Sequence, residues 1–135
     1  MHLYYRIIGI IEDAWDTFRI RCQRFKRGYA YRDVWDMDHW FMRTVRLMLI
    51  HLRDYGDGCP MEFNDRDEWC AVLDEMINCV ELMYEDNVWG FLGFVETEDY
   101  ERMTDADFKK IGEIMEANKN RFFELFGKHF YSLWD

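Results

Sequence analysis

Apolar residues recur at steps of three and four along most of this chain, which is the period of a helix with one buried face. The first stripe predicts a helix from about residue 3 to 26, ended by Gly28. Its apolar members are Tyr4, Ile7, Ile8, Ile11, Ala14, Trp15, Phe18, Cys22 and Phe25. A second predicted helix starts at Asp33, a residue type favoured at helix N-caps, and runs to about Tyr55. Its expected buried face consists of Val34, Met37, Phe41, Val45, Met48 and Leu52.

One turn and two capping pairs organise the second half of the chain. Residues 56–60 read Gly-Asp-Gly-Cys-Pro and predict a turn. Asp65 and Glu68 have the spacing of a capping box, which predicts a third helix from about residue 67 to 86. Thr104 and Asp107 predict the start of a last helix. Between these helices, the segment 88–100 carries an apolar run up to Val95 that two glycines interrupt, which predicts a packed loop or short extended segment, or an oligomer contact.

These elements predict an all-α fold, a compact bundle of about four helices that forms a single domain over residues 1–135. Eight glycines and one proline leave few breaks between long helices. We expect Trp15, Phe41, Trp69, Met76, Phe122 and Phe126 to be buried. The C-terminus is apolar, so Trp134 is expected to dock into the core or into a neighbouring subunit.

The longest apolar runs are short and interrupted by charged residues, which predicts no membrane-spanning helix and no membrane partner. Residues 1–14 also lack the pattern of a signal peptide, because acidic residues follow the apolar run and no small-residue cleavage site is present. The expected location is therefore the cytoplasm.

Charge is distributed unevenly along the chain. Residues 19–53 carry a net charge of +6, whereas residues 54–135 carry a net charge of −14. One interpretation is a solvated acidic surface with its cations clustered by chance. The other is a basic patch for an anionic partner, in a protein whose overall charge of −10 would repel bulk nucleic acid.

Several classes of chemistry find little support in the sequence. The four cysteines form no Cys-x-x-Cys pair, so they are expected to be small hydrophobes rather than zinc ligands or disulfide partners. Asp36 and His39 have the spacing used in di-iron bundles, but no second copy of that pair exists. Ser132 is the only serine, and no cysteine has an evident histidine partner. We therefore expect no enzymatic activity, no metal and no cofactor.

The stretch from residue 27 to 40 combines aromatic and charged side chains around one glycine. Arginines can donate charge-assisted hydrogen bonds to phosphate, and tyrosine and tryptophan rings can stack on a base. The candidate ligand-binding residues are Arg27, Tyr29, Tyr31, Arg32, Trp35, Asp36, His39, Trp40, Arg43 and Arg46. The alternative is that the aromatic rings pack the junction of the first two helices while Asp33, Asp36 and Asp38 neutralise the arginines.

Six short motifs occur in order along most of the chain. They are Arg27-Gly28-Tyr29, Asp33-x-Trp35-x-x-Asp38, Gly58-Cys59-Pro60, Glu68-Trp69, Leu73-Asp74-x-Met76 and Leu133-Trp134-Asp135. In this pattern the chain resembles a widespread group of small proteins of tailed bacteriophages. Small accessory phage proteins often antagonise host defence, and one strategy is to sequester nucleotide immune signals in the pockets of small oligomers. The resemblance implies a lifestyle of this kind and assigns no role to any residue.

Together, these features predict a protein that binds and sequesters a small anionic nucleotide-type signal in the cytoplasm of an infected bacterial host. The high aromatic content, 19% of the residues, predicts self-association, most simply as a dimer. One alternative is an acidic inhibitor that mimics nucleic acid and blocks a host nuclease or CRISPR effector through Glu75, Glu81 and Glu85. Another is a structural or interaction module without a ligand.

Overall fold

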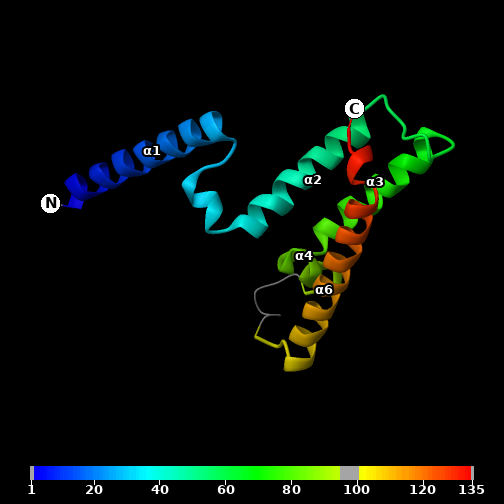
Figure 1. Ribbon diagram of the computed structural model, residues 1–135. Helices are drawn as coiled ribbons and strands as arrows, with labels where there is room; N and C mark the ends of the chain where they lie inside the picture. Colours follow the sequence, from blue (N-terminus) through cyan, green and yellow to red (C-terminus); the bar gives the residue numbers. More distant parts are fainter. Residues whose placement is uncertain (1, 95–100, 135) are drawn as a thin grey trace. The chain divides into compact units, whose positions relative to one another are not determined.

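The structure is a computed structural model that describes residues 2–94 and 101–134, with side chains described at residue 10 and from residue 13 onward in these ranges. The chain is 76% helical and the described residues contain no strand, which confirms the all-α class. Five α-helices lie in the described residues, one more than predicted, with two short 3-10 helices (Figure 1). The chain divides into two compact units, Met1–Arg43 and Thr44–Asp135, and each is described by itself. The single domain stays a prediction.

The first unit is built on α1, a helix of 26 residues from His2–Arg27. It ends where the sequence predicts, because Gly28 has a φ of 77° in the left-handed region that favours glycine. The Gly28 N–H donates to the Arg24 carbonyl oxygen at 2.8 Å and closes the last turn. Arg24, Lys26 and Arg27 lie in this turn, where the negative end of the helix dipole favours cations.

Asp33 lies in a short 3-10 helix, η1 (Tyr31–Val34), and not at the start of the next helix, α2 (Met37–Tyr55). Its side chain is 8% exposed. The carboxylate accepts hydrogen bonds from Arg24 Nε at 3.0 Å, Arg24 Nη2 at 2.5 Å and the Ala30 N–H at 2.7 Å. The N-cap prediction is therefore wrong, because this carboxylate ties η1 back to α1.

From residue 13 onward, most of the apolar stripe of α1 is exposed. Trp15 and Phe18, whose ring centroids lie 5.9 Å apart, are 66% and 58% exposed, and Phe25 is 92% exposed. Within this unit η1 packs on the polar side of α1, where Gln23 Oε1 accepts a hydrogen bond from the Tyr31 N–H at 2.8 Å. The predicted burial of Trp15 is wrong because η1 meets the other side of the helix.

The second unit is centred on α3 (Arg66–Glu81) and α6 (Asp105–Lys128), which pack side by side (Figure 1). Both predicted starts are confirmed. The Asp65 side chain accepts from the Glu68 N–H at 2.9 Å, and Thr104 and Asp107 form a capping box. The largest fully buried side chains are Trp69, Phe122, Leu73, Met76, Val80 and Val88. Of the predicted core, Trp69, Met76 and Phe122 are thus confirmed, whereas Phe41 and Phe126 are only half-buried.

Ion pairs join α3 to the part of α2 that belongs to the second unit. Arg46 pairs with Glu81, and Arg53 Nη1 lies 2.7 Å from Asp74 Oδ1. Leu49, which shares this side of α2, is 3% exposed. The predicted buried face was therefore partly wrong, because the ion pairs orient a neighbouring side of the helix toward α3. Of the predicted members Val45 is buried, Phe41 and Leu52 are half-buried, and Val34, Met37 and Met48 are more than half exposed.

A short helix, α4 (Glu85–Phe91), replaces the loop or extended segment predicted here. Gly90 inside α4 costs about 1 kcal/mol relative to alanine. The complete burial of Val88 and the packing of α4 on α6 offset that cost. Gly93, with a φ of 89°, ends the helical segment. Residues 95–100 of the predicted segment lie outside the described residues.

The C-terminal end of α6 is fixed by His129, which is 2% exposed. His129 Nδ1 lies 2.8 Å from a carboxylate oxygen of Glu62, and the His129 ring packs against Trp69 at 5.7 Å between centroids. A 3-10 turn, η2 (Phe130–Ser132), follows. Trp134 is 67% exposed, so it does not dock into the core. Its docking into a neighbouring subunit stays a prediction.

Candidate functional site

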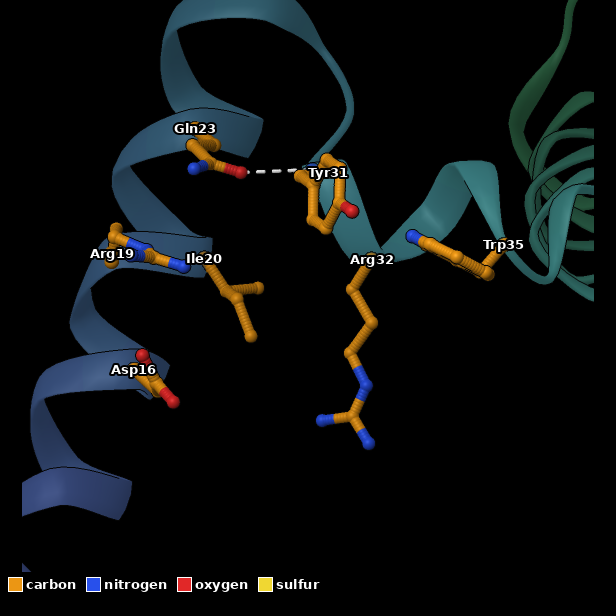
Figure 2. Close-up of a pocket in the computed structure, with 7 residues that line it drawn as sticks. All are labelled: Asp16, Arg19, Ile20, Gln23, Tyr31, Arg32 and Trp35. Atoms are coloured by element: carbon orange, nitrogen blue, oxygen red, sulfur yellow. Dashed lines mark hydrogen bonds between the residues drawn. The ribbon is translucent and has the colours of Figure 1, made fainter.

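A groove of about 340 Å³ lies within the first unit, between the second half of α1 and η1. Figure 2 shows the two walls and the space that separates them. The wall from α1 consists of Asp16, Arg19, Ile20 and Gln23, and the opposite wall consists of Tyr31, Arg32 and Trp35. Pockets for small molecules range from about 300 to 1,000 Å³. The groove is therefore large enough for a small ligand, at the lower end of that range.

The groove keeps its shape because Asp33 holds η1 against α1. The Arg24 guanidinium donates two hydrogen bonds to Asp33 and lowers the pKa of its carboxyl to about 2, against the opposing effect of burial. The Ala30 N–H and the nearby charge of Arg43 lower this pKa further. At neutral pH the Asp33 carboxylate is therefore charged and neutralises Arg24. The two arginines that line the groove, Arg19 and Arg32, remain to bind a ligand.

Two arginines provide the positive charge of the groove. Among the residues that the structure describes, Arg19 and Arg32 form no ion pair, and both are exposed. Figure 2 shows Arg32 and Ile20 facing one another across the groove, with Asp16 below them on α1. Two guanidinium groups and one carboxylate give the described part of the lining a net positive charge, which favours an anion over a neutral ligand.

Aromatic rings cover one end of the groove. Tyr31 and Trp35 meet edge to face, with their ring centroids 6.2 Å apart and an interplanar angle of 73°. They are 59% and 75% exposed, so the Trp35 ring is open to a ligand. A flat conjugated group could stack on Trp35 while Ile20 contacts its apolar edge.

The structure brings three of the predicted site residues together, Tyr31, Arg32 and Trp35. Arg27 and Tyr29 are not part of the lining of the groove. The Arg27 guanidinium carbon sits 5.5 Å from the centroid of the Tyr29 ring, a cation–π contact between two exposed side chains.

The other five predicted residues extend from Asp36, just before α2, to Arg46 in the middle of that helix, and they do not line the groove. The Asp36 carbonyl oxygen accepts from the Trp40 N–H at 2.9 Å, His39 Nδ1 lies 3.5 Å from Asp38 Oδ1, and Arg43 acts on the pKa of Asp33. Arg46 is part of the second unit, in its ion pair with Glu81. The alternative in which aspartates neutralise arginines thus applies to the Arg24–Asp33 pair.

Four lining residues were missed by sequence reasoning, Asp16, Arg19, Ile20 and Gln23. They carry a signal that could have identified them, because offsets of 3, 4 and 7 place them on one side of a helix. That side mixes acidic, basic and apolar side chains, whereas periodicity searches select apolar positions, so the pattern is not recognised by them.

Comparison of the chain with protein-family models, with curated proteins and with solved structures found no match. In the described residues, no helix has the length and hydropathy needed to cross a membrane. Over the same ranges, no three His, Cys, Asp or Glu side chains converge as they would around a metal ion. The function is therefore argued from the geometry of the groove.

Proposed function

We propose that the chain binds a small anionic nucleotide-type ligand in the groove and sequesters it without cleaving it. As a phage-type accessory protein, it would in this way antagonise a host defence that signals through such nucleotides. The observation that carries the proposal is the convergence of Arg19, Arg32 and the open ring of Trp35 in one groove. A nucleotide carries both a charged phosphate and a flat base, and these two chemistries match.

Arg19 and Arg32 come from opposite walls, and rotation of these two exposed side chains could bring both guanidinium groups to one phosphate. Each hydrogen bond to a charged group contributes about 1.5–3 kcal/mol. Stacking of a base on an aromatic ring contributes about 1–3 kcal/mol. The three contacts together contribute about 4–9 kcal/mol before the cost of immobilising the ligand is subtracted. Micromolar binding, about −8 kcal/mol, therefore requires more than one hydrogen bond from each guanidinium group to the phosphate oxygens.

The lining favours binding over turnover. Among the described side chains, neither histidine nor cysteine lines the groove, and Asp16 is the one carboxylate in the lining. A hydrolytic reaction would need a nucleophile or activated water together with a general base and a group that stabilises the leaving oxygen. Sequestration needs only tight and slow-releasing contacts, which arginine and tryptophan side chains can supply.

The alternative of an acidic protein inhibitor is less well supported. Glu75 Oε1 lies 2.7 Å from Arg121 Nε, and Glu81 pairs with Arg46. Two of the three glutamates expected to mimic nucleic acid are therefore engaged in internal ion pairs. Their reversal to lysine would disturb the packing of α3 as well as any partner contact.

The proposal also includes the self-association expected from composition, a cytoplasmic location and a compact bundle of about four helices. Exposed apolar side chains support self-association, and those at the C-terminal end are Phe130, Tyr131 and Trp134. Tyr131 is 91% exposed. A dimer would cover part of this surface.

The proposal is tested by calorimetric titration of the purified chain with a panel of cyclic dinucleotides and ADP-ribose derivatives. For a ligand that binds, Arg32→Ala should raise Kd about tenfold or more. The matched control is Arg21→Ala, because Arg21 is an exposed arginine of α1 outside the groove. Equal effects of the two substitutions would show that only overall charge matters and would refute a site in the groove.

A second pair of variants tests the stacking contact. Trp35→Ala should also raise Kd about tenfold. Trp134→Ala, which removes a similarly exposed tryptophan from the second unit, should leave Kd unchanged. Circular dichroism of all four variants should retain the helical signal, which separates loss of binding from loss of fold.

A further inference from the structure

Two different surfaces occupy two sides of α1. Each residue of an α-helix is rotated by about 100° from the one before it. By this rotation, one arc of about 80° around the α1 axis contains Trp15, Phe18, Cys22 and Phe25. The four groove residues of α1 are centred about 130° away from that arc. η1 and the groove use the polar side, and the described aromatic rings of the apolar side remain exposed.

The exposure of the apolar side is unusually high. Phe25 is 92% exposed, Trp15 66% and Phe18 58%. Scattered single apolar side chains are ordinary on a protein surface, but a row of aromatic rings along one helix marks an interaction surface. The chain also leaves α1 on the opposite side, because Asp33 and Gln23 fasten η1 there. The residues that follow α1 in the same unit are therefore directed away from this row.

We propose that the row of Trp15, Phe18, Cys22 and Phe25 is the surface on which a second copy of this chain docks, through its own α1 in antiparallel orientation. The partner is identified by charge. Residues 10–18 contain three carboxylates, and residues 19–27 contain five arginines and lysines. Antiparallel pairing places the acidic half of each helix beside the basic half of the other. Parallel pairing would place like charges together.

The same orientation pairs the rings with suitable partners. With the two helices crossing near Ile20, Trp15 of each copy lies opposite Phe25 of the other, and Phe18 lies opposite Cys22. At about 200 Å² per aromatic ring, and with each of the three rings weighted by its exposed fraction, the rings contribute about 400 Å² per copy. That is a small interface compared with the about 1,600 Å² total of standard complexes, so association in the micromolar range is expected.

Such a dimer leaves the groove open on each copy. One ligand per chain is expected, and a substitution in the apolar row should not change ligand affinity. The inference rests on the proposed self-association and not on the identity of the ligand, so the two can fail separately.

Sedimentation equilibrium of the full chain tests the surface. Wild-type protein should be a dimer at about 100 µM, and Phe18→Glu should raise the dimer Kd about tenfold or more. Met61→Glu is the matched control, because Met61 is fully exposed, apolar and part of the second unit. Circular dichroism should show both variants helical, since neither side chain is buried. A monomeric wild type would overturn both self-association and this surface, whereas a dimer that Phe18→Glu does not weaken would overturn the surface alone.

Salt tests the orientation independently. In antiparallel pairing, opposite charges attract across the interface, so raising NaCl from about 50 to about 500 mM should weaken the dimer. In parallel pairing the basic halves repel, and the same salt would strengthen it. A dimer strengthened by salt would therefore refute the antiparallel arrangement.

Discussion

Replacing Asp33 by asparagine tests the contact that shapes the groove. The substitution keeps the size of the side chain but removes the negative charge of the carboxylate, whose two oxygens accept hydrogen bonds from Arg24. The pKa of Asp33 falls from its ordinary 3.8 to about 2. At about 1.4 kcal/mol per pKa unit, this shift corresponds to about 2 kcal/mol. Arg24 is 48% exposed, so solvent screening reduces the expected loss to about 1–2 kcal/mol.

The readout is amide hydrogen exchange at Tyr31, measured by NMR. The Tyr31 N–H donates to Gln23 Oε1 and not to Asp33, so its protection reports the docking of η1 on α1. A loss of about 1–2 kcal/mol should speed its exchange about 5- to 30-fold. Asp38→Asn is the control, because Asp38 is 75% exposed. Unchanged exchange at Tyr31 in Asp33→Asn would refute the role assigned to this carboxylate.

The same contact predicts a dependence on pH. Because the folded pKa of Asp33 lies below its ordinary value, its contribution is complete above about pH 4 and is lost as the pH falls toward 2. Amide chemical shifts of Ala30 and Tyr31 should therefore change between about pH 4 and pH 2 in the wild type. The change should be absent from Asp33→Asn, and its persistence there would assign it to another group.

Two further predictions concern the second unit. Gly90→Ala should raise its free energy of unfolding by about 0.5–1 kcal/mol, because Gly90 is inside α4 and an added Cβ meets no atom within 4 Å. Gly93→Ala should lower the free energy of unfolding by about 1–2 kcal/mol, because a φ of 89° is strained for alanine. Urea unfolding measures both changes in free energy. If the two substitutions changed the free energy of unfolding in the same direction, the assignment of α4 would be contradicted. Iodoacetamide should modify exposed Cys59 much faster than Cys79, which is 5% exposed and whose pKa is raised by burial, as followed by mass spectrometry. Faster modification of Cys79 would show that the α3 core opens readily.

Local signals in the sequence predicted the helices well. Gly28 ends α1, and Thr104 with Asp107 starts α6, because each depends on residues next to it in the chain. Trp69 and Phe122 were recognised as core because each lies on a single apolar stripe. In these cases the physical cause is contained within one or two turns of helix.

Predictions that depended on distant partners were less accurate. The buried side of α2 is set by ion pairs from Arg46 and Arg53 to α3, and periodicity could not choose between two apolar sides of one helix. Asp33 has the residue type of an N-cap, but its carboxylate accepts two hydrogen bonds from Arg24 and does not cap α2. For the groove, the wall that contains η1 could be predicted because its aromatic and basic residues are close together in the sequence. The wall from α1 could not be predicted, because its residues line a groove only once η1 packs against that side of α1.

The most direct test of the proposed function is to look for a ligand retained by the protein. Purified wild-type chain is incubated with extracts of infected, signal-producing cells, washed and denatured, and the released small molecules are identified by mass spectrometry. The proposal predicts an intact nucleotide, about one per chain, that is strongly reduced from Arg32→Ala and Trp35→Ala but retained by Arg21→Ala. Absence of any nucleotide, together with a melting temperature that no cyclic dinucleotide or ADP-ribose derivative changes, would contradict it.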